Sequence, residues 1–329
     1  MAEGMLNRRT VLITGATGFI GRALTRRLLE RGDRVIVLSR DPVRAHLILG
    51  TAPMVAERLS DIPAALTIDA VVNLAGAPII SRPWTKARKR VLVTSRIGTT
   101  RTLVDWLASR TQRPEALVSA SAIGWYGSAS SNGCGDTLLD ESAPLGDGFA
   151  AVLCSAWERE AASATALGLR VCRLRLGLVL GAEGGMLKSL LPFYRAGLGA
   201  VLGDGKPWLS WIHRDDAVEL IVRAIADPLF SGAINATAPV PVRQSEFART
   251  LGRVLHRPVW LRIPAAPLRA GLGDRADLLL EGPRVLPKRA LDIGFAFRCH
   301  EIEPALHDLL MPQAERHGAT VRLLDDLLT

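Results

Sequence analysis

Short apolar runs alternate with longer amphipathic segments along the first half of the chain. The short runs are rich in β-branched and aliphatic residues, as buried strands are, and the longer segments carry apolar residues at helical spacing. Strands are expected at residues 10–14, 34–38, 69–74, 116–121 and 170–180. Helices are expected at residues 19–31, 84–110 and 150–167. Strands that alternate with helices predict an α/β fold built on a doubly wound parallel sheet.

The pattern changes after residue 216, where helical segments dominate and prolines recur. A chain of 329 residues is long enough for one large domain and a smaller one. We expect the sheet domain at residues 8–235 and a smaller, mostly helical C-terminal domain at residues 236–329. Part of residues 181–215 is a candidate contribution to the second domain.

Composition and charge narrow the class of protein. No apolar run approaches the roughly 18 residues of a membrane span, and we see no signal peptide. The cysteines at positions 134, 154, 172 and 299 follow no zinc or redox spacing, so we expect reduced thiols in a cytoplasmic protein. The net charge of +9 comes from mostly dispersed bases, and the densest patch, residues 86–90, has no aromatic stacking pattern. Membrane and nucleic-acid partners are therefore not expected, whereas an anionic small molecule suits the charge.

A glycine-rich turn follows the first expected strand and precedes the first expected helix, as in dinucleotide-binding βαβ units. The first glycine permits a tight turn, the second lets the backbone approach a pyrophosphate, and the third allows close helix–strand packing. The helix N-terminus supplies N–H groups and a dipole that favour phosphates. The expected cofactor-binding residues are Gly15, Ala16, Thr17, Gly18, Phe19, Ile20 and Gly21, joined after a later strand by Leu74, Ala75 and Gly76.

The residues after the second strand indicate which dinucleotide binds. NAD-specific proteins usually carry Asp or Glu there to bind the ribose 2′-hydroxyl, whereas this chain has Ser39 and Arg40. Arg pairs well with a phosphate, and Ser can donate a hydrogen bond to one. NADP is therefore favoured over NAD as cofactor. The alternative is that Arg40 simply pairs with neighbouring Asp41.

Three motifs, at residues 14–21, 73–76 and 211–216, resemble the extended short-chain dehydrogenase/reductase superfamily in its NAD-dependent epimerase/dehydratase branch. Finer patterns resemble the "epimerase family protein" subgroup, which has an appended C-terminal domain of unknown function; they lie at residues 119–127, 157–158, 173–181, 235–239 and 278–297. The resemblance implies a Rossmann domain followed by a C-terminal substrate domain. Members of the superfamily often dimerise, so a homodimer is one state open to this chain.

The resemblance also implies hydride chemistry that depends on a Ser or Thr and on a Tyr-x-x-x-Lys pair at the start of the helix after the fifth strand. Anchored on Glu158, that pattern places Ala150 and Cys154 at the Tyr and Lys positions, where neither can do the same work. Ser121 remains in the orienting position at the end of its strand. Tyr126 is the nearest phenol and a candidate replacement for the missing acid. The alternative is that its hydroxyl satisfies a loop carbonyl.

Two functions remain open from the sequence. The first is an NADP-binding oxidoreductase or sugar-nucleotide-epimerase-like enzyme with an unknown small-molecule substrate. The second, favoured by the missing Tyr and Lys, is a non-catalytic NADP(H) redox sensor that regulates a protein partner. No group of His, Asp and Glu residues has metal-ligand spacing, so no metal is expected.

Overall fold

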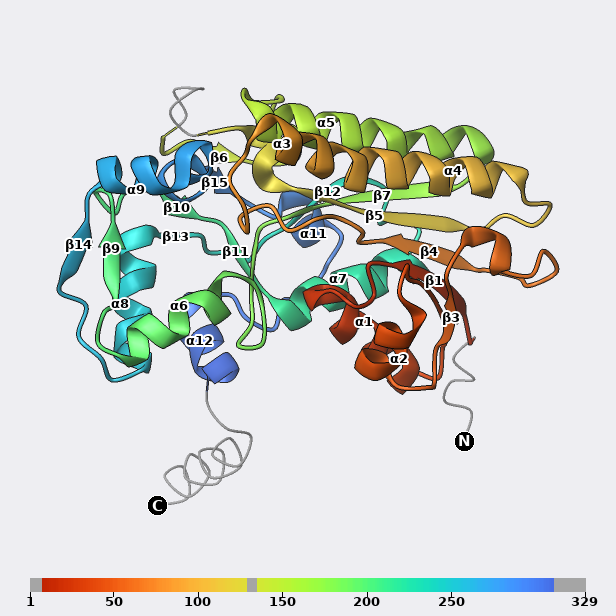
Figure 1. Cartoon of the computed structure of the whole chain (residues 1–329), viewed down its shortest axis with the longest axis horizontal. Helices are drawn as coiled ribbons and strands as arrows, with labels where there is room; N and C mark the ends of the chain where they lie inside the picture. The colour runs from red at the N-terminus through yellow and green to blue at the C-terminus, as the bar shows by residue number, and fades with distance from the viewer. Residues whose placement is uncertain (1–7, 129–134, 311–329) are drawn as a thin grey trace, which may run out of the picture.

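Seven parallel strands form the central sheet of the protein in the computed structural model (Figure 1). The structure describes residues 8–128 and 135–310. The order of the strands across the sheet confirms the predicted doubly wound α/β fold. From one edge to the other they are β12 (Gly232–Ala236), β7 (Arg170–Leu176), β5 (Ala116–Ala122), β4 (Ala70–Asn73), β1 (Thr10–Thr14), β2 (Arg34–Leu38) and β3 (Met54–Ala56).

Helices cover both faces of this sheet (Figure 1). In β1, Val11 and Ile13 pack into the core under α1 and α7, while Leu12 packs into the core under α4 and α5. Because both faces of the sheet are buried, the sequences of these strands are continuous apolar runs. The helices of the first face are α1 (Phe19–Glu30), α2 (Pro42–Leu49) and α7 (Arg214–Ala226), and those of the second are α3 (Lys86–Val93), α4 (Thr99–Ser109) and α5 (Phe149–Ala162).

A second hydrophobic core lies at the left of Figure 1. Its helices are α6 (Gly185–Arg195), α8 (Gln244–Val254) and α12 (Ile302–Leu310), with α9 (Ala265–Leu272), α10 (Asp277–Leu280) and α11 (Lys288–Asp292) elsewhere in the C-terminal part. The short strands outside the main sheet pair as β8 (Leu178–Leu180) with β11 (Trp211–His213), β9 (Ala200–Leu202) with β14 (Leu261–Ile263), β10 (Trp208–Leu209) with β13 (Val242–Arg243), and β6 (Leu138–Leu139) with β15 (Arg284–Val285). Phe295 and Phe297 pack instead into the core of the main sheet. The division at residue 235 stays a prediction.

Two expected elements are interrupted. The helix expected at 84–110 is α3 and α4 joined by a π-helical turn, Thr94–Gly98. The strand expected at 170–180 breaks at Gly177, where an added Cβ would lie 2.8 Å from the Thr237 side chain. After this glycine, β8 leaves the main sheet and pairs with β11. Neither break was predicted from the sequence.

Candidate functional site

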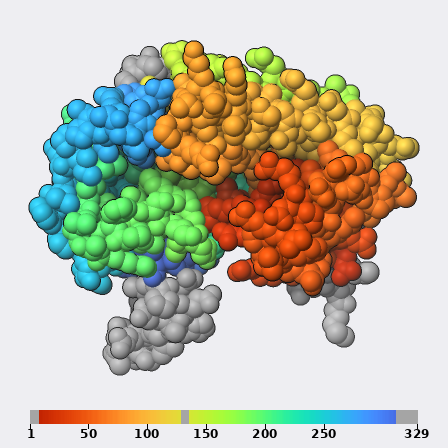
Figure 2. Space-filling model, viewed as in Figure 1, coloured from red at the N-terminus to blue at the C-terminus, as the bar shows by residue number. Residues whose placement is uncertain are grey.

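The strand order reverses between β1 and β4, and a cavity of about 750 Å³ opens near the ends of these strands. Ligands of doubly wound sheets bind beyond the carboxyl ends of the strands at such a reversal. Figure 2 shows a hollow where the red N-terminal segment, the orange segment that includes α3 and the green segment that includes α6 meet. The lining comes from the turn after β1, the segments after β4 and β5, α3, Arg96, α5 and Met186, together with residues 147–148, 176–179, 208–210 and 274–283.

The turn after β1 requires glycine at two positions. Gly15 has φ +72°, and an added Cβ would lie 2.7 Å from the Leu74 carbonyl carbon. At Gly21 an added Cβ would lie 2.6 Å from the Cα of Ala16. Atoms do not approach this closely, so the turn can press against β4 and the first turn of α1 only because both side chains are absent.

The N-terminus of α1 is open to an anion. Gly18 is its N-cap, no side chain caps it, and its first turn contains no acidic residue. The first N–H groups of the helix therefore lack a side-chain partner among the described residues and point, with the helix dipole, at the cavity side of the turn. This arrangement fits the pyrophosphate of a dinucleotide.

The predicted cofactor residues divide into two groups. Ala16 is buried beneath the turn, and the cavity lining does not include Thr17, Ala75, Ser39 or Arg40. The residues that line the cavity are Gly15, Gly18, Phe19, Ile20, Gly21, Leu74 and Gly76.

Ser39 and Arg40 directly follow β2, so they lie at the carboxyl ends of the parallel strands. The Ser39 hydroxyl donates to the Asp41 carbonyl at 3.1 Å. The Asp41 carboxylate caps α2 by accepting from the Arg44 N–H at 2.9 Å. Arg40 is exposed, and none of the carboxylates that the structure describes forms an ion pair with it. The pairing of Arg40 with Asp41 that the sequence left open is therefore absent from the described residues.

Ser121, at the end of β5, lines the cavity. Its hydroxyl donates to Glu158 Oε1 at 2.8 Å. Glu158 is buried on α5 and is held by Arg175, whose Nε and Nη2 donate to its two oxygens at 2.8 and 3.2 Å. The hydroxyl oxygen of Ser121 therefore remains able to accept a hydrogen bond from a molecule in the cavity, while its proton is engaged.

Tyr126 is directed away from the cavity into a buried network. Its side chain is 1% exposed, and its hydroxyl donates to Asn235 Oδ1 at 2.7 Å and accepts from Arg175 Nη1 at 3.0 Å. Burial raises the pKa of Tyr126 to about 12. The cavity lining includes Gly124 and Gly127 on either side of this residue but not Tyr126 itself. Its geometry is that of a phenol that orders the network around Arg175.

One face of α5 forms a wall of the cavity. Ala150, Cys154 and Trp157 follow at helical spacing and all line it. The positions that the family pattern assigns to Tyr and Lys thus do face the cavity, with a methyl group and a thiol in their place. Burial raises the pKa of Cys154 to about 11, so the sulfur is a neutral thiol at physiological pH.

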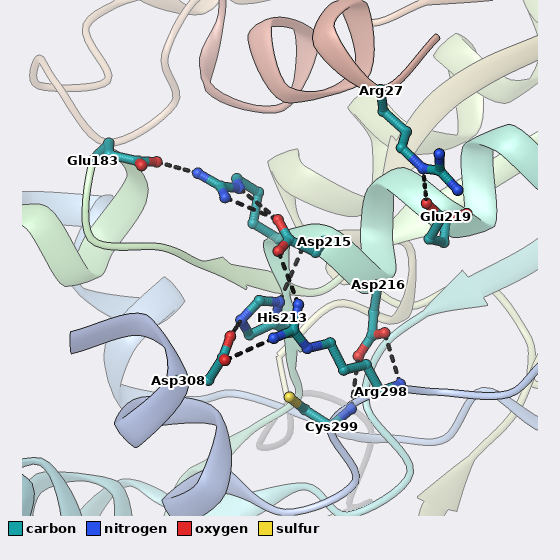
Figure 3. A network of polar contacts seen from close by, with 10 residues as sticks. Arg27, Glu183, His213, Asp215, Asp216, Glu219, Arg298, Cys299 and Asp308 are labelled. Atoms are coloured by element: carbon teal, nitrogen blue, oxygen red, sulfur yellow. Dashed lines mark hydrogen bonds and ion pairs between the residues drawn. The ribbon is translucent and has the colours of Figure 1, made fainter. Parts of the chain in front are cut away.

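The motif around His213 joins the start of α7 to the C-terminal segment (Figure 3). His213 is fully buried, its Nδ1 accepts from the Asp215 N–H at 3.1 Å, and its Nε2 lies 3.2 Å from Asp308. Asp216 accepts from the backbone N–H groups of Arg298 and Cys299 at 2.8 and 3.1 Å. These side chains connect the start of α7 to α12 and to residues 298–299.

No sequence motif predicted several of the charged residues that line the cavity. Lys89 Nζ, from α3, pairs with Asp274 of the C-terminal part at 2.9 Å. Arg96, from the π-helical turn, lies near Gly76, where an added Cβ would be 3.1 Å from its Cζ. The sequence showed a basic patch at residues 86–90, but only the packing of α3 brings one of its members to the cavity. The acidic residues of the lining are Asp147, Asp274, Asp277 and Glu281.

Neither a cluster of metal ligands nor a membrane-spanning helix occurs in residues 8–128 and 135–310. Within those ranges no group of three or more His, Cys, Asp and Glu side chains could hold a metal ion. None of the helices there is both long and apolar enough to cross a membrane. Cys154, Cys172 and Cys299 are buried free thiols, and Cys134 lies outside the described residues.

Two family models match the chain. Residues 11–235 match the NAD dependent epimerase/dehydratase family, and residues 263–309 match a domain of unknown function, DUF1731. The chain is 40% identical over 310 residues to "Epimerase family protein SDR39U1 homolog, chloroplastic" from Arabidopsis thaliana, covering 92% of this chain and 87% of that protein. It is 35% identical to "Epimerase family protein YfhF" from Bacillus subtilis, covering 91% and 97%.

Solved structures agree with these matches. Human epimerase family protein SDR39U1 (isoform 2), crystallised with NADPH, superposes with a TM-score of 0.81 at 32% identity, covering 91% of this chain and 98% of that one. A nucleoside-diphosphate sugar epimerase from Corynebacterium glutamicum superposes with a TM-score of 0.72 at 31% identity, covering 92% of this chain and 58% of that one. The glycine turn, the cavity at the strand reversal and these likenesses lead to one conclusion: the chain belongs to the NAD dependent epimerase/dehydratase family.

Proposed function

We propose that the protein binds NADP(H) at the turn after β1 and acts on a small-molecule substrate as an oxidoreductase or epimerase-like enzyme. The observation that carries this proposal is the uncapped start of α1 opening onto a cavity that continues to Ser121 and α5. A cavity of about 750 Å³ is large enough for a cofactor's reactive end and a small substrate together. The human relative named above was crystallised with NADPH, which agrees with this cofactor.

The preference for NADP over NAD rests on Arg40. Its guanidinium is exposed, unpaired among the described carboxylates, and placed after β2, where the ribose 2′ position of a dinucleotide would lie. A 2′-phosphate would supply the missing partner, with the Ser39 hydroxyl beside it.

The cofactor would supply the hydride, and the chain would supply position and electrostatics. Ser121 would accept a hydrogen bond from the substrate, because its own proton is held by Glu158. Tyr126 would act as a positioning residue through Arg175 and not as the proton donor, because it lies outside the cavity lining. Proton transfer would then fall to a bound water or to the substrate itself.

A redox sensor is the second candidate. The observation that favours it is the face of α5, where Ala150 and Cys154 offer no acid or base with a pKa near neutrality. In this case the protein would bind NADP(H) in the same cavity without turnover, and a surface would change with the redox state of the cofactor.

Fluorescence titration of the purified protein with NADPH and NADH tests both candidates, after a check for cofactor that co-purifies. We expect NADPH to bind at least about tenfold more tightly than NADH, and Arg40→Asp to lower NADPH affinity about 10- to 100-fold. Arg34→Asp, an exposed residue at the opposite end of β2, is the matched control and should leave affinity unchanged. Failure to bind either dinucleotide would remove both candidates. Equal affinities, or no effect of Arg40→Asp, would remove the NADP preference.

If NADPH binds, loss of its absorbance with a panel of carbonyl compounds separates the enzyme from the sensor. A compound that oxidises NADPH at a rate reduced by Ser121→Ala supports the enzyme. Tight binding without turnover, together with a change in protease sensitivity between NADP⁺ and NADPH, supports the sensor.

A further inference from the structure

Arg96 lines the cavity, and no carboxylate in residues 8–128 and 135–310 pairs with it. Its side chain is half-buried, and its hydrogen bond, to the Leu92 carbonyl of its own helical segment, is 3.5 Å long. Two other guanidinium groups provide a contrast: buried Arg175 binds both oxygens of Glu158, and half-buried Arg170 donates to three backbone carbonyls. Buried charges are normally paired. Apart from the Leu92 carbonyl, none of the described residues accepts a hydrogen bond from the Arg96 side chain, which leaves donors unused at the wall of the cavity.

The position of Arg96 is held by a small polar network. Thr100 Oγ1 donates to the Arg96 carbonyl at 2.7 Å and accepts from Trp157 Nε1 at 3.0 Å and Asn73 Nδ2 at 2.8 Å. The guanidinium carbon lies 5.3 Å from the centre of the Trp157 ring, a cation–π distance. The residue also sits in a π-helical turn, a feature found frequently at functional sites. The cation is thus placed in advance and does not need to be ordered by a ligand.

Beyond the Trp157 ring, none of the described side chains brings a negative charge to this guanidinium. Burial lowers the pKa of Arg96; nearby Cys154 opposes this shift, and Arg88 adds to it. The adjacent residue on α5 is Cys154, a neutral thiol at physiological pH. Lys89, the other cation of the lining, is already paired with Asp274. An anion that entered the cavity would therefore find its strongest unpaired partner at Arg96.

We propose that Arg96 is the anion-binding residue of the substrate part of the cavity, and that the substrate carries a carboxylate or phosphate group. The planar guanidinium can donate two parallel hydrogen bonds to either group. This inference rests on the proposed function, because it assigns the start of α1 to the pyrophosphate of the cofactor. Arg96, by contrast, packs on Trp157 of α5, beside the residues where a reacting group would lie.

Calorimetric titration with two simple probes, inorganic phosphate and malonate, tests the inference on the NADPH-loaded protein at constant ionic strength. We expect wild-type protein to bind one equivalent of at least one probe, and Arg96→Gln to bind it at least about tenfold more weakly. Arg90→Gln, an exposed arginine on α3, is the matched control and should bind the probe like wild type. NADPH affinity should stay within about threefold of wild type in both variants. Arg96→Lys keeps the charge but loses the planar guanidinium, and it replaces Arg96→Gln in the test if Arg96→Gln does not fold.

Three results would overturn the inference. The first is probe affinity that is the same in Arg96→Gln and wild type, or no probe binding at all. The second is an NADPH affinity reduced about tenfold or more in Arg96→Gln, which would make Arg96 a cofactor residue and leave the proposed function intact. The third is a probe that competes with NADPH, which would place the anion on the pyrophosphate site. If wild-type protein binds no NADPH, the proposed function fails, and the same titrations of the unloaded protein still decide whether Arg96 binds anions.

Discussion

The buried pair of Glu158 and Arg175 joins α5 to β7 behind the cavity, and its removal should destabilise the protein measurably. Both side chains are almost fully buried, at 2% and 3% exposed, and two hydrogen bonds of 2.8 and 3.2 Å connect them. The guanidinium also lies 3.9 Å from the centre of the Trp125 ring. The change that we would make is Arg175→Met, which preserves much of the apolar stem but removes the charge.

The expected loss follows from leaving the Glu158 carboxylate buried without its main partner. Breaking one side of a buried ion pair costs about 3–5 kcal/mol. Arg173, whose Nη1 lies 3.6 Å from the same carboxylate, partly compensates. We therefore expect the lower value, about 3 kcal/mol, which for a chain of this length lowers the melting temperature by about 4 °C. The double variant Glu158→Leu with Arg175→Met buries no charge and should recover most of that loss.

Thermal unfolding followed by circular dichroism at pH 7.5 measures the effect. Arg173→Met is the matched control on the same strand, because its side chain is 27% exposed and its distance to Glu158 is longer. It should lower the melting temperature by less than about 1.5 °C. A melting temperature of Arg175→Met within about 1 °C of wild type would refute this role of the ion pair, and so would a double variant that is no more stable than Arg175→Met.

Three further predictions concern the turn, the thiol and the buried histidine. Gly21→Ala places a methyl group 2.6 Å from the Cα of Ala16 and should weaken NADPH binding at least about 100-fold in equilibrium dialysis. The control Gly271→Ala adds a methyl group in open space and should leave binding unchanged. Unchanged binding in Gly21→Ala would contradict the steric argument. Cys154 has a pKa of about 11, so iodoacetamide at pH 8 should alkylate it at least about 100-fold more slowly than a free thiol. Mass spectrometry of the peptide that contains Cys154 measures this rate. Rapid labelling would show that burial does not protect the thiol. Burial lowers the pKa of His213 below its unfolded value of about 6.5, so its contribution to stability is present above that pH and lost as the pH falls. The melting temperature should therefore fall between about pH 7 and 5.5, less steeply in His213→Gln than in wild type, and equal slopes would exclude this histidine as the cause.

The strands of the main sheet and the cofactor turn could be predicted from the sequence because their causes are local. β1, β2, β4 and β5 are apolar on both sides, and the expected and observed bounds differ by no more than one residue at either end. The turn from Gly15 to Gly21 needs glycine for reasons of backbone geometry within a few residues. The role of Tyr126 could not be predicted in this way. Its hydroxyl donates to Asn235, which lies 109 residues further along the chain, and the residues next to Tyr126 in the sequence do not predict that contact.

The sequence by itself determined the order of strands and helices, the family, and the absence of a Tyr and a Lys from the face of α5, because each depends on residue type and spacing along the chain. Only the tertiary structure decided which side chains meet in the cavity. Lys89, Arg96 and Asp274 come from α3, a π-helical turn and the C-terminal part, and their juxtaposition follows from packing between distant elements. Charge pairing in a fold is set by distance in space. That Arg96 is half-buried, with no carboxylate partner among the described residues, could therefore be found only once its neighbours were in place.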